Sequence, residues 1–259
     1  MVARLSGNFA SFMQLHKTKG IVLRNVKYGE TSLVVTLYTE LFGLQSYLVN
    51  GVRAASKKGQ SKSGYFQPGA LLDLVVYHNE LKNLQRIREF RWAVLYQHIF
   101  FDVLKNAVAL FMVELLQKCL KQPEPNPDLF YFIEDAFLHL DESEGTVLGN
   151  YPLFFSLHLA GFFGFRIQDE WSEDTPVLDL VEGQFVAESP SHRNALEGNY
   201  SYLTSLLLRV RRPEELMEIP LGQDTRRQLL QAYQDFYHLH VSDFGQMKTM
   251  PVLQAILNP

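Results

Sequence analysis

The stretch Lys19–Asn50, KGIVLRNVKYGETSLVVTLYTELFGLQSYLVN, decides the fold of the first third of the chain. Apolar and polar side chains alternate over Ser32–Thr39, which is typical of a strand with one buried and one wet face. Turn signals at Tyr28-Gly29-Glu30 and Leu41-Phe42-Gly43 separate this segment from its apolar neighbours. The stretch therefore predicts three short strands joined by tight turns.

Two further apolar runs follow and extend the predicted sheet. The predicted strands are Gly20–Lys27, Ser32–Thr39, Leu44–Asn50, Leu71–His78 and Leu84–Phe90. Five short strands within about seventy residues leave no room for crossover helices, so we expect a small antiparallel barrel of the OB or SH3-like type. Between the third and fourth strands, Gly51–Gly69 is rich in Gly, Ser and Lys and predicts a long basic loop.

After Arg91 the apolar spacing becomes helical. Residues that step by three or four from Trp92 to Val113 predict one apolar stripe on a long helix ending near Lys121. Further helices are predicted over residues 129–140 (capped by Asp128), 153–163, 200–209, 225–241 and 250–257, with an acidic loop at 141–145. We therefore expect an α+β chain with an extension over residues 1–16, a barrel domain over 17–90 and an all-α domain over 91–259.

The composition is that of a globular protein, with 47% hydrophobic and 20% charged residues among 259. The single cysteine, Cys119, cannot form an internal disulfide, so we expect a cytoplasmic protein. Residues 1–16 lack the pattern of a secretory signal, and the apolar block at residues 153–165 is too short to span a membrane. The sequence has no P-loop, G-x-G-x-x-G, H-E-x-x-H or G-x-S-x-G motif, which lowers the expectation of an enzyme.

Charge divides the chain into a basic first third and an acidic remainder. Residues 1–91 hold 13 Lys and Arg against 5 Asp and Glu, whereas residues 92–259 hold 11 against 23. Phosphate backbones are bound through many modest Lys and Arg contacts, so the predicted barrel is a candidate DNA-binding surface. We expect its cations to share one side, where exposed Tyr28, Tyr38 or Tyr47 could stack on bases. The candidate DNA-binding residues are Lys19, Arg24, Lys27, Arg53, Lys57, Lys58 and Lys62.

The order of these residues resembles the N-terminal domain of the bacterial RecO family of DNA repair and recombination mediators. The resemblance rests on Tyr28-Gly29-Glu30, Leu37-Tyr38-Thr39-Glu40, Gly43, Gly51-Val52-Arg53 and Phe66-Gln67-Pro68, and it continues more loosely to the end of the chain. It implies an OB-fold followed by a helical domain, with no enzymatic turnover and a place at the bacterial nucleoid. It also implies binding of single- and double-stranded DNA, strand annealing, and RecA loading together with RecR and the tail of single-strand-binding protein.

Two features depart from the family pattern. Many members carry a four-cysteine zinc site in the region that corresponds to residues 165–195, where this chain has no cysteine. We therefore expect a metal-free remnant that is held by packing, and no cofactor. Members also tend to begin near the first strand, so we expect residues 1–12 to be an upstream start or a tail, with Met13 as the working initiator.

The tail of single-strand-binding protein is acidic and ends in an apolar residue, so its receptor should combine an apolar groove with a few cations. Arg226, Arg227 and Lys248 are the candidates in the helical domain. Two other functions stay open on the sequence alone. One is a protein–protein adaptor whose basic loop only keeps it soluble, and the other is a hydrolase whose active-site residues lie apart in the sequence.

Overall fold

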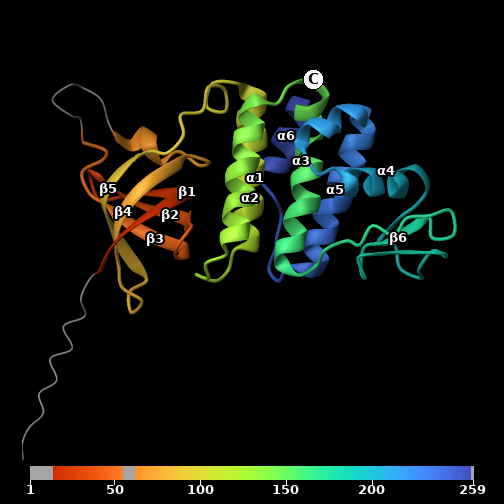
Figure 1. Cartoon of the computed structure of the whole chain (residues 1–259), viewed down its shortest axis with the longest axis horizontal. Helices are drawn as coiled ribbons and strands as arrows, with labels where there is room; N and C mark the ends of the chain where they lie inside the picture. Colours follow the sequence, from red (N-terminus) through yellow and green to blue (C-terminus); the bar gives the residue numbers. More distant parts are fainter. Residues whose placement is uncertain (1–13, 55–61, 258–259) are drawn as a thin grey trace, which may run out of the picture. The chain divides into compact units, whose positions relative to one another are not determined.

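The computed structural model describes residues 14–54 and 62–257, which form two compact units (Figure 1). The barrel unit runs up to Val94 and also includes the short segment Gln122–Pro127. The helical unit consists of Leu95–Lys121 and of the chain from Asp128 onward. The expectations for residues 1–12 and Met13 lie outside the described residues.

The barrel is a closed sheet of five strands in the order β1-β2-β3-β5-β4, with β1 also paired to β4. This order confirms the predicted OB-type barrel. The expectation of a purely antiparallel sheet was wrong at one pair, because β3 and β5 run parallel. The strand after β3, β4, pairs with β1 and not with β3, so β5, which runs antiparallel to β4, has the same direction as β3 where the two meet. The elements are β1 (Gln14–Tyr28), β2 (Ser32–Thr39), β3 (Gly43–Val49), η1 (Lys62–Phe66), β4 (Leu71–His78) and β5 (Leu84–Trp92).

Alternating apolar side chains fill the barrel. Leu33, Val35 and Leu37 of β2 are buried, as the alternation predicts. The first strand begins at Gln14, six residues before the predicted start, because its polar first half pairs with the whole of β4. A β-bulge between Val22 and Arg24 then bends β1 from β4 toward β2.

The helical unit contains six α-helices among the described residues, and its core centres on α3, which is buried along most of its length (Figure 1). The helix begins at Gly145 rather than at the predicted residue 153, because Pro152 is accommodated inside it. No helix of the described residues is long and apolar enough to cross a membrane. The helices are α1 (Val103–Cys119), α2 (Pro127–Glu142), α3 (Gly145–Ala160), α4 (Gly198–Arg209), α5 (Gln223–His240) and α6 (Thr249–Leu257).

The predicted long helix was wrong over its first part, from Trp92 to Phe101, because α1 starts only at Val103, and it is confirmed from there to Cys119, close to the predicted end near Lys121. Asp102 caps the helix, its carboxylate accepting a hydrogen bond from the Lys105 N–H at 2.8 Å. The preceding segment, residues 95–101, is not helical and is held by Asp141 of α2 through three backbone N–H groups. Val103 is 71% exposed, so the three-and-four spacing there marks no buried face.

The region expected to be a zinc-site remnant forms a small sheet in the order β7-β6-β8. Its strands are β6 (Val177–Asp179), β7 (Gln184–Val186) and β8 (Ala195–Leu196). Leu178 and Phe185 are buried between this sheet and its surroundings. Across the residues that the structure describes, no three His, Cys, Asp or Glu side chains group as metal ligands would, and the absence of zinc stays a prediction.

Candidate nucleic-acid interface

One outward face of the barrel carries the features of an oligonucleotide surface. Residues directly opposite each other in paired strands point to the same side of the sheet. Val22 faces Leu37 in the core, and the bulge then turns Arg24, which faces Thr36, outward. Further cross-strand partners continue this face to β5. We call this face the platform, made of Arg24, Val26, Tyr28, Ser32, Val34, Thr36, Ser46, Leu48, Leu84 and Arg86.

The platform combines exposed flat or apolar side chains with cations. Tyr28 is 57% exposed and Val26 45%, while Arg24 and Arg86 lie at its two flanks, on β1 and β5. Val26, Val34, Leu48 and Arg86 form one continuous row across four strands. The outer face of strands two and three is where OB-folds hold oligonucleotides, through stacking and backbone contacts.

Only one of the three tyrosines considered for stacking is available. Tyr38 and Tyr47 are fully buried, so the expectation that they could be exposed was wrong. Tyr38 points outward from β2 but is covered, and its hydroxyl donates to the carbonyl of Asn126 at 3.3 Å. Burial raises its pKa to about 12. Tyr47 points into the barrel, where its partner across the strands is Gln85.

Arg53 supports the turn that carries Tyr28. Its guanidinium donates to the carbonyl of Gly29 at 3.1 Å, and its backbone N–H donates to the carbonyl of Thr31 at 2.9 Å. The Arg53 side chain is half-buried. Its hydrogen bonds hold the β1–β2 turn in place.

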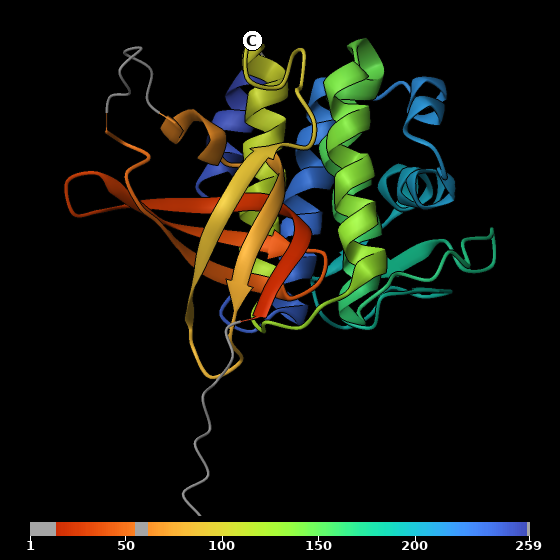
Figure 2. The same ribbon diagram turned by 60° about the vertical axis from the view of Figure 1, so that its left-hand side comes forward.

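Lys27 and Lys62 belong to a different end of the barrel. Lys27 pairs with the core residue Leu33 and therefore points away from the side of Arg24. Asn25, on the same side as Lys27, donates to the Phe66 carbonyl of η1 at 2.7 Å. Both ribbon views place η1, which begins at Lys62, over one end of the barrel (Figures 1 and 2). The remaining two candidates, Lys57 and Lys58, lie outside the described residues.

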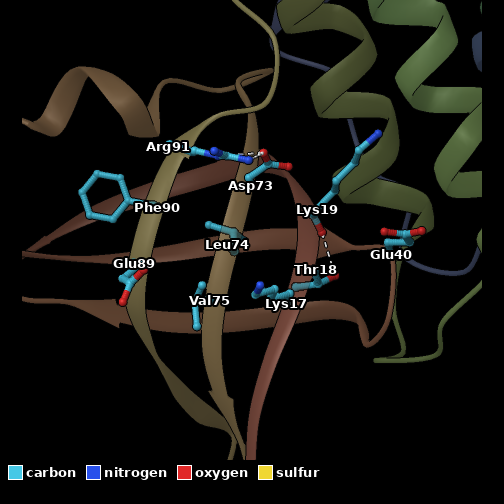
Figure 3. A pocket seen from close by; sticks show the side chains of 10 residues that line it. All are labelled: Lys17, Thr18, Lys19, Glu40, Asp73, Leu74, Val75, Glu89, Phe90 and Arg91. Carbon is cyan, nitrogen blue, oxygen red and sulfur yellow. Dashed lines mark hydrogen bonds and ion pairs between the residues drawn. The ribbon is translucent and has the colours of Figure 1, made fainter.

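Lys19 lies on the outward face of β1, β4 and β5, in a hollow of about 510 Å³ (Figure 3). Three cations line this hollow, and one of them, Arg91, forms a 2.9 Å ion pair with Asp73. Three carboxylates line it as well, so the hollow offers no excess of positive charge to a polyanion. The charged lining residues are Lys17, Lys19, Arg91, Glu40, Asp73 and Glu89.

The described candidate cations therefore do not share one side, contrary to the expectation from the sequence. Arg24 lies on the platform, Lys19 in the balanced hollow, and Lys27 and Lys62 at the η1 end. Arg86 was missed by sequence reasoning. Its place beside Leu48 depends on the parallel pairing of β3 with β5, which the alternation within β5 does not reveal.

Two of the candidates for tail binding line one small apolar depression of the helical unit. Arg226 and Arg227 border it together with Gly149, Pro152, Leu153, Leu230 and Gln254. The Arg226 guanidinium lies against Gly149 and donates to the Leu221 carbonyl at 2.9 Å. Its Nε has no hydrogen-bond partner among the described residues, and burial lowers its pKa.

The other two candidates for tail binding, Arg227 and Lys248, have different surroundings from those of Arg226. Arg227 forms a 2.8 Å ion pair with Asp224. Lys248 does not line the depression, and its backbone N–H donates to Glu114 of α1 at 2.8 Å. Of the two arginines that line the depression, Arg226 is therefore the one that forms no ion pair with a carboxylate in the described part of the chain.

Comparison with known proteins identifies relatives along nearly the whole chain. Residues 13–96 match the family model described as recombination protein O N terminal, and residues 101–249 match the model described as recombination protein O C terminal. The DNA repair protein RecO of Christiangramia forsetii is 31% identical over 245 residues, which cover 94% of this chain and 99% of that protein. RecO of Phocaeicola vulgatus is 29% identical, over 94% of this chain and 100% of that protein. RecO of Flavobacterium johnsoniae is 30% identical, over 93% and 99%. The chain belongs to the RecO family of DNA repair and recombination proteins.

Proposed function

We propose that this chain is a non-enzymatic recombination mediator of the bacterial cytoplasm and nucleoid. It binds single- and double-stranded DNA without sequence preference, promotes annealing, and helps RecR to load RecA onto DNA coated by single-strand-binding protein. Family membership supports this role. The observation that carries the DNA-binding part is the platform, where Arg24 and the exposed Val26 and Tyr28 follow one another along β1 and Arg86 ends the same face on β5.

The platform suits a strand whose bases contact side chains and whose phosphates contact arginines. Every base has a flat face, so stacking on Tyr28 and apolar contact with Val26 are tolerant of sequence. Arg24 and Arg86 would hold the sugar–phosphate backbone, which carries no sequence information. Lys27 and Lys62 would extend the contact toward the η1 end, and Lys57 and Lys58 are proposed as contacts on their charge alone. Lys19 contributes least, because its hollow contains as many carboxylates as cations.

Salt dependence tests the platform. We expect Arg24→Ala to weaken binding of a fluorescent oligo-dT and to flatten the slope of log K against log salt by about 0.7, the value for one lost single-strand phosphate contact. Lys17→Ala, a matched charge removal in the balanced hollow, should leave the slope unchanged. Wild-type protein with no salt-sensitive DNA affinity would favour the adaptor function instead.

Arg226 supports docking of the tail of single-strand-binding protein. A half-buried guanidinium without a carboxylate partner among the described residues is stabilised by an incoming acidic group. The depression beside it, walled by Pro152, Leu153 and Leu230, has a volume of only about 10 Å³, so an apolar terminal residue would have to lie over it or open it. We expect Arg226→Ala to weaken binding of an acidic peptide ending in phenylalanine about tenfold, since a charged hydrogen bond contributes roughly 1.5–3 kcal/mol. Lys248→Ala is the control and should not change it. Equal losses for both variants would argue against this location.

A further inference from the structure

The barrel unit has a second hollow, of about 630 Å³, where the platform reaches the β4–β5 turn. Thr36 and Ser46 line it and also belong to the platform. His78, at the end of β4, lines it too, as do Phe42 and Lys82 from the neighbouring turns. All of its lining residues belong to the barrel unit. Its volume falls in the range of sites that enclose small molecules or parts of larger ones. A strand that follows the platform therefore reaches this hollow without leaving the barrel.

The hollow contains a stacked pair of rings. The rings of Phe42 and His78 lie 3.9 Å apart at an angle of 13°, and His16 meets Phe42 edge-on at 5.1 Å. Burial lowers the pKa of His78, which favours its neutral imidazole. Flat, neutral rings at the surface of an OB-fold are the groups on which unpaired bases stack.

The polar lining matches the edge of a base better than it matches phosphate. Thr36, Ser46 and Asn83 bring hydroxyl and amide groups that both donate and accept hydrogen bonds, as base edges do. Lys82 is the one lysine or arginine among the lining residues, and Glu80 is the one acid. One lysine suits the single phosphate next to a bound base, whereas a backbone site needs several cations.

The turn above the hollow is already ordered. The buried amide of Gln85 donates to the carbonyls of Asn79 at 2.8 Å and Lys82 at 2.6 Å, and its oxygen accepts from the Asn79 N–H at 3.0 Å. The Asn79 side chain in turn accepts from the Leu81 N–H at 2.9 Å. A ligand therefore does not have to order this turn, which favours binding. Leu81 is 88% exposed in this turn and does not line the hollow.

We propose that this hollow receives one unpaired nucleobase of a strand that lies along the platform, so that the barrel itself favours single-stranded over double-stranded DNA. The inference rests on the proposed function, because it requires DNA on the platform. A base in a duplex is stacked and paired, and it has to be extruded before it can enter such a hollow. A base in a single strand enters at little cost, and the difference appears as preference for the single strand.

The test compares three probes on the full-length protein: oligo-dT, an abasic strand of the same length, and a duplex. We expect His78→Ala to weaken binding of oligo-dT about tenfold, within the range for loss of one stacked base. The abasic strand and the duplex should change less than about twofold, because neither offers a free base. His139→Ala, a half-buried histidine on α2, is the matched control and should affect none of the three.

Two results would overturn the base site while leaving DNA binding intact. One is an equal loss of affinity by His78→Ala for all three probes. The other comes from the wild-type protein, which makes the test independent of how the variant folds. A 2-aminopurine at the centre of the strand should lose fluorescence when the protein binds. The site is excluded if the bound strand is as bright as the free one and the protein binds the abasic strand as tightly as oligo-dT. If no probe binds even at low salt, the proposed function fails instead.

Discussion

Asp141→Asn tests how α2 holds the non-helical segment, residues 95–101, that precedes α1. The Asp141 carboxylate accepts hydrogen bonds from the backbone N–H groups of Gln97 at 2.7 Å and of His98 and Ile99 at 2.8 Å. Burial alone would raise the pKa of this carboxyl, but these three hydrogen bonds lower it below its usual value. The ionised form therefore stabilises the fold, and its removal has a definite pH signature.

The substitution keeps one acceptor and replaces the other by an amide NH₂ group. The oxygen of asparagine can still accept from His98 and Ile99, but its NH₂ group then faces the Gln97 N–H, which is left without a partner. A hydrogen bond to a charged group contributes roughly 1.5–3 kcal/mol, and leaving a buried donor unpaired costs about 1–3 kcal/mol. We therefore expect the free energy of unfolding to fall by about 3 kcal/mol at pH 7. With about 2–4 °C per kcal/mol for a chain of this size, Tm should fall by roughly 6–12 °C.

Circular dichroism melts of wild type and variant across pH measure this effect. Because the folded-state pKa is depressed, the contribution of Asp141 is fully present above the unfolded-state pKa of about 4 and is lost as pH falls through the folded-state value. The difference between the two proteins should therefore shrink as wild-type Asp141 becomes protonated. Asp135→Asn, an exposed position on the same helix, is the control and should be near neutral. A difference in Tm that is the same at pH 7 and pH 3 would refute the reasoning.

Three further predictions concern the barrel, the last helix and zinc. Gly43→Ala should lower the free energy of unfolding, measured in urea, by about 2–4 kcal/mol, because φ is +59° and a Cβ would collide with the Glu124 carbonyl oxygen. The control is Gly51→Ala, also at positive φ but with no described atom close to the added Cβ, which should cost only about 1 kcal/mol. Glu114→Gln should cost about 1–2 kcal/mol at pH 7, because the carboxylate accepts from the Lys248 and Thr249 N–H groups at 2.8 and 2.7 Å, and equal stability of the two proteins would contradict this role. Hydrogen bonds lower the pKa of Glu114 although burial opposes them, so this difference should fade in acid. Elemental analysis of the purified protein should find zinc well below one ion per chain, and a stoichiometric ion would contradict the cysteine-free remnant.

The barrel could be predicted because its local signals agree with its tertiary structure. The alternation over β2 and the turns that flank it appear in the structure at nearly the predicted residues. The positions of the cations could not be predicted in the same way, because a bulge adds one residue to β1 and reverses the side on which every later residue points. Alternation alone cannot locate that extra residue, so it could not show that Lys19 and Arg24 both point outward from β1 while Lys27 does not.

Burial of Tyr38 and the start of α1 escaped for a related reason: both depend on contacts between distant residues. The Tyr38 hydroxyl meets Asn126, and the non-helical segment before α1 is held by Asp141. Neither contact has a local signature. For the platform, the sequence supplied Arg24 and Tyr28, and only the parallel pairing of β3 with β5 added Arg86.

Residues 122–127 leave the helical part of the chain to complete the barrel, where Gly43 touches Glu124 and Tyr38 binds Asn126. A fragment that stops at Val94 would thus expose a tyrosine and a glycine turn that the intact protein shields. Such a fragment would aggregate more readily and be less stable than the intact barrel domain. An isolated barrel fragment should therefore include residues 122–127, joined through a linker.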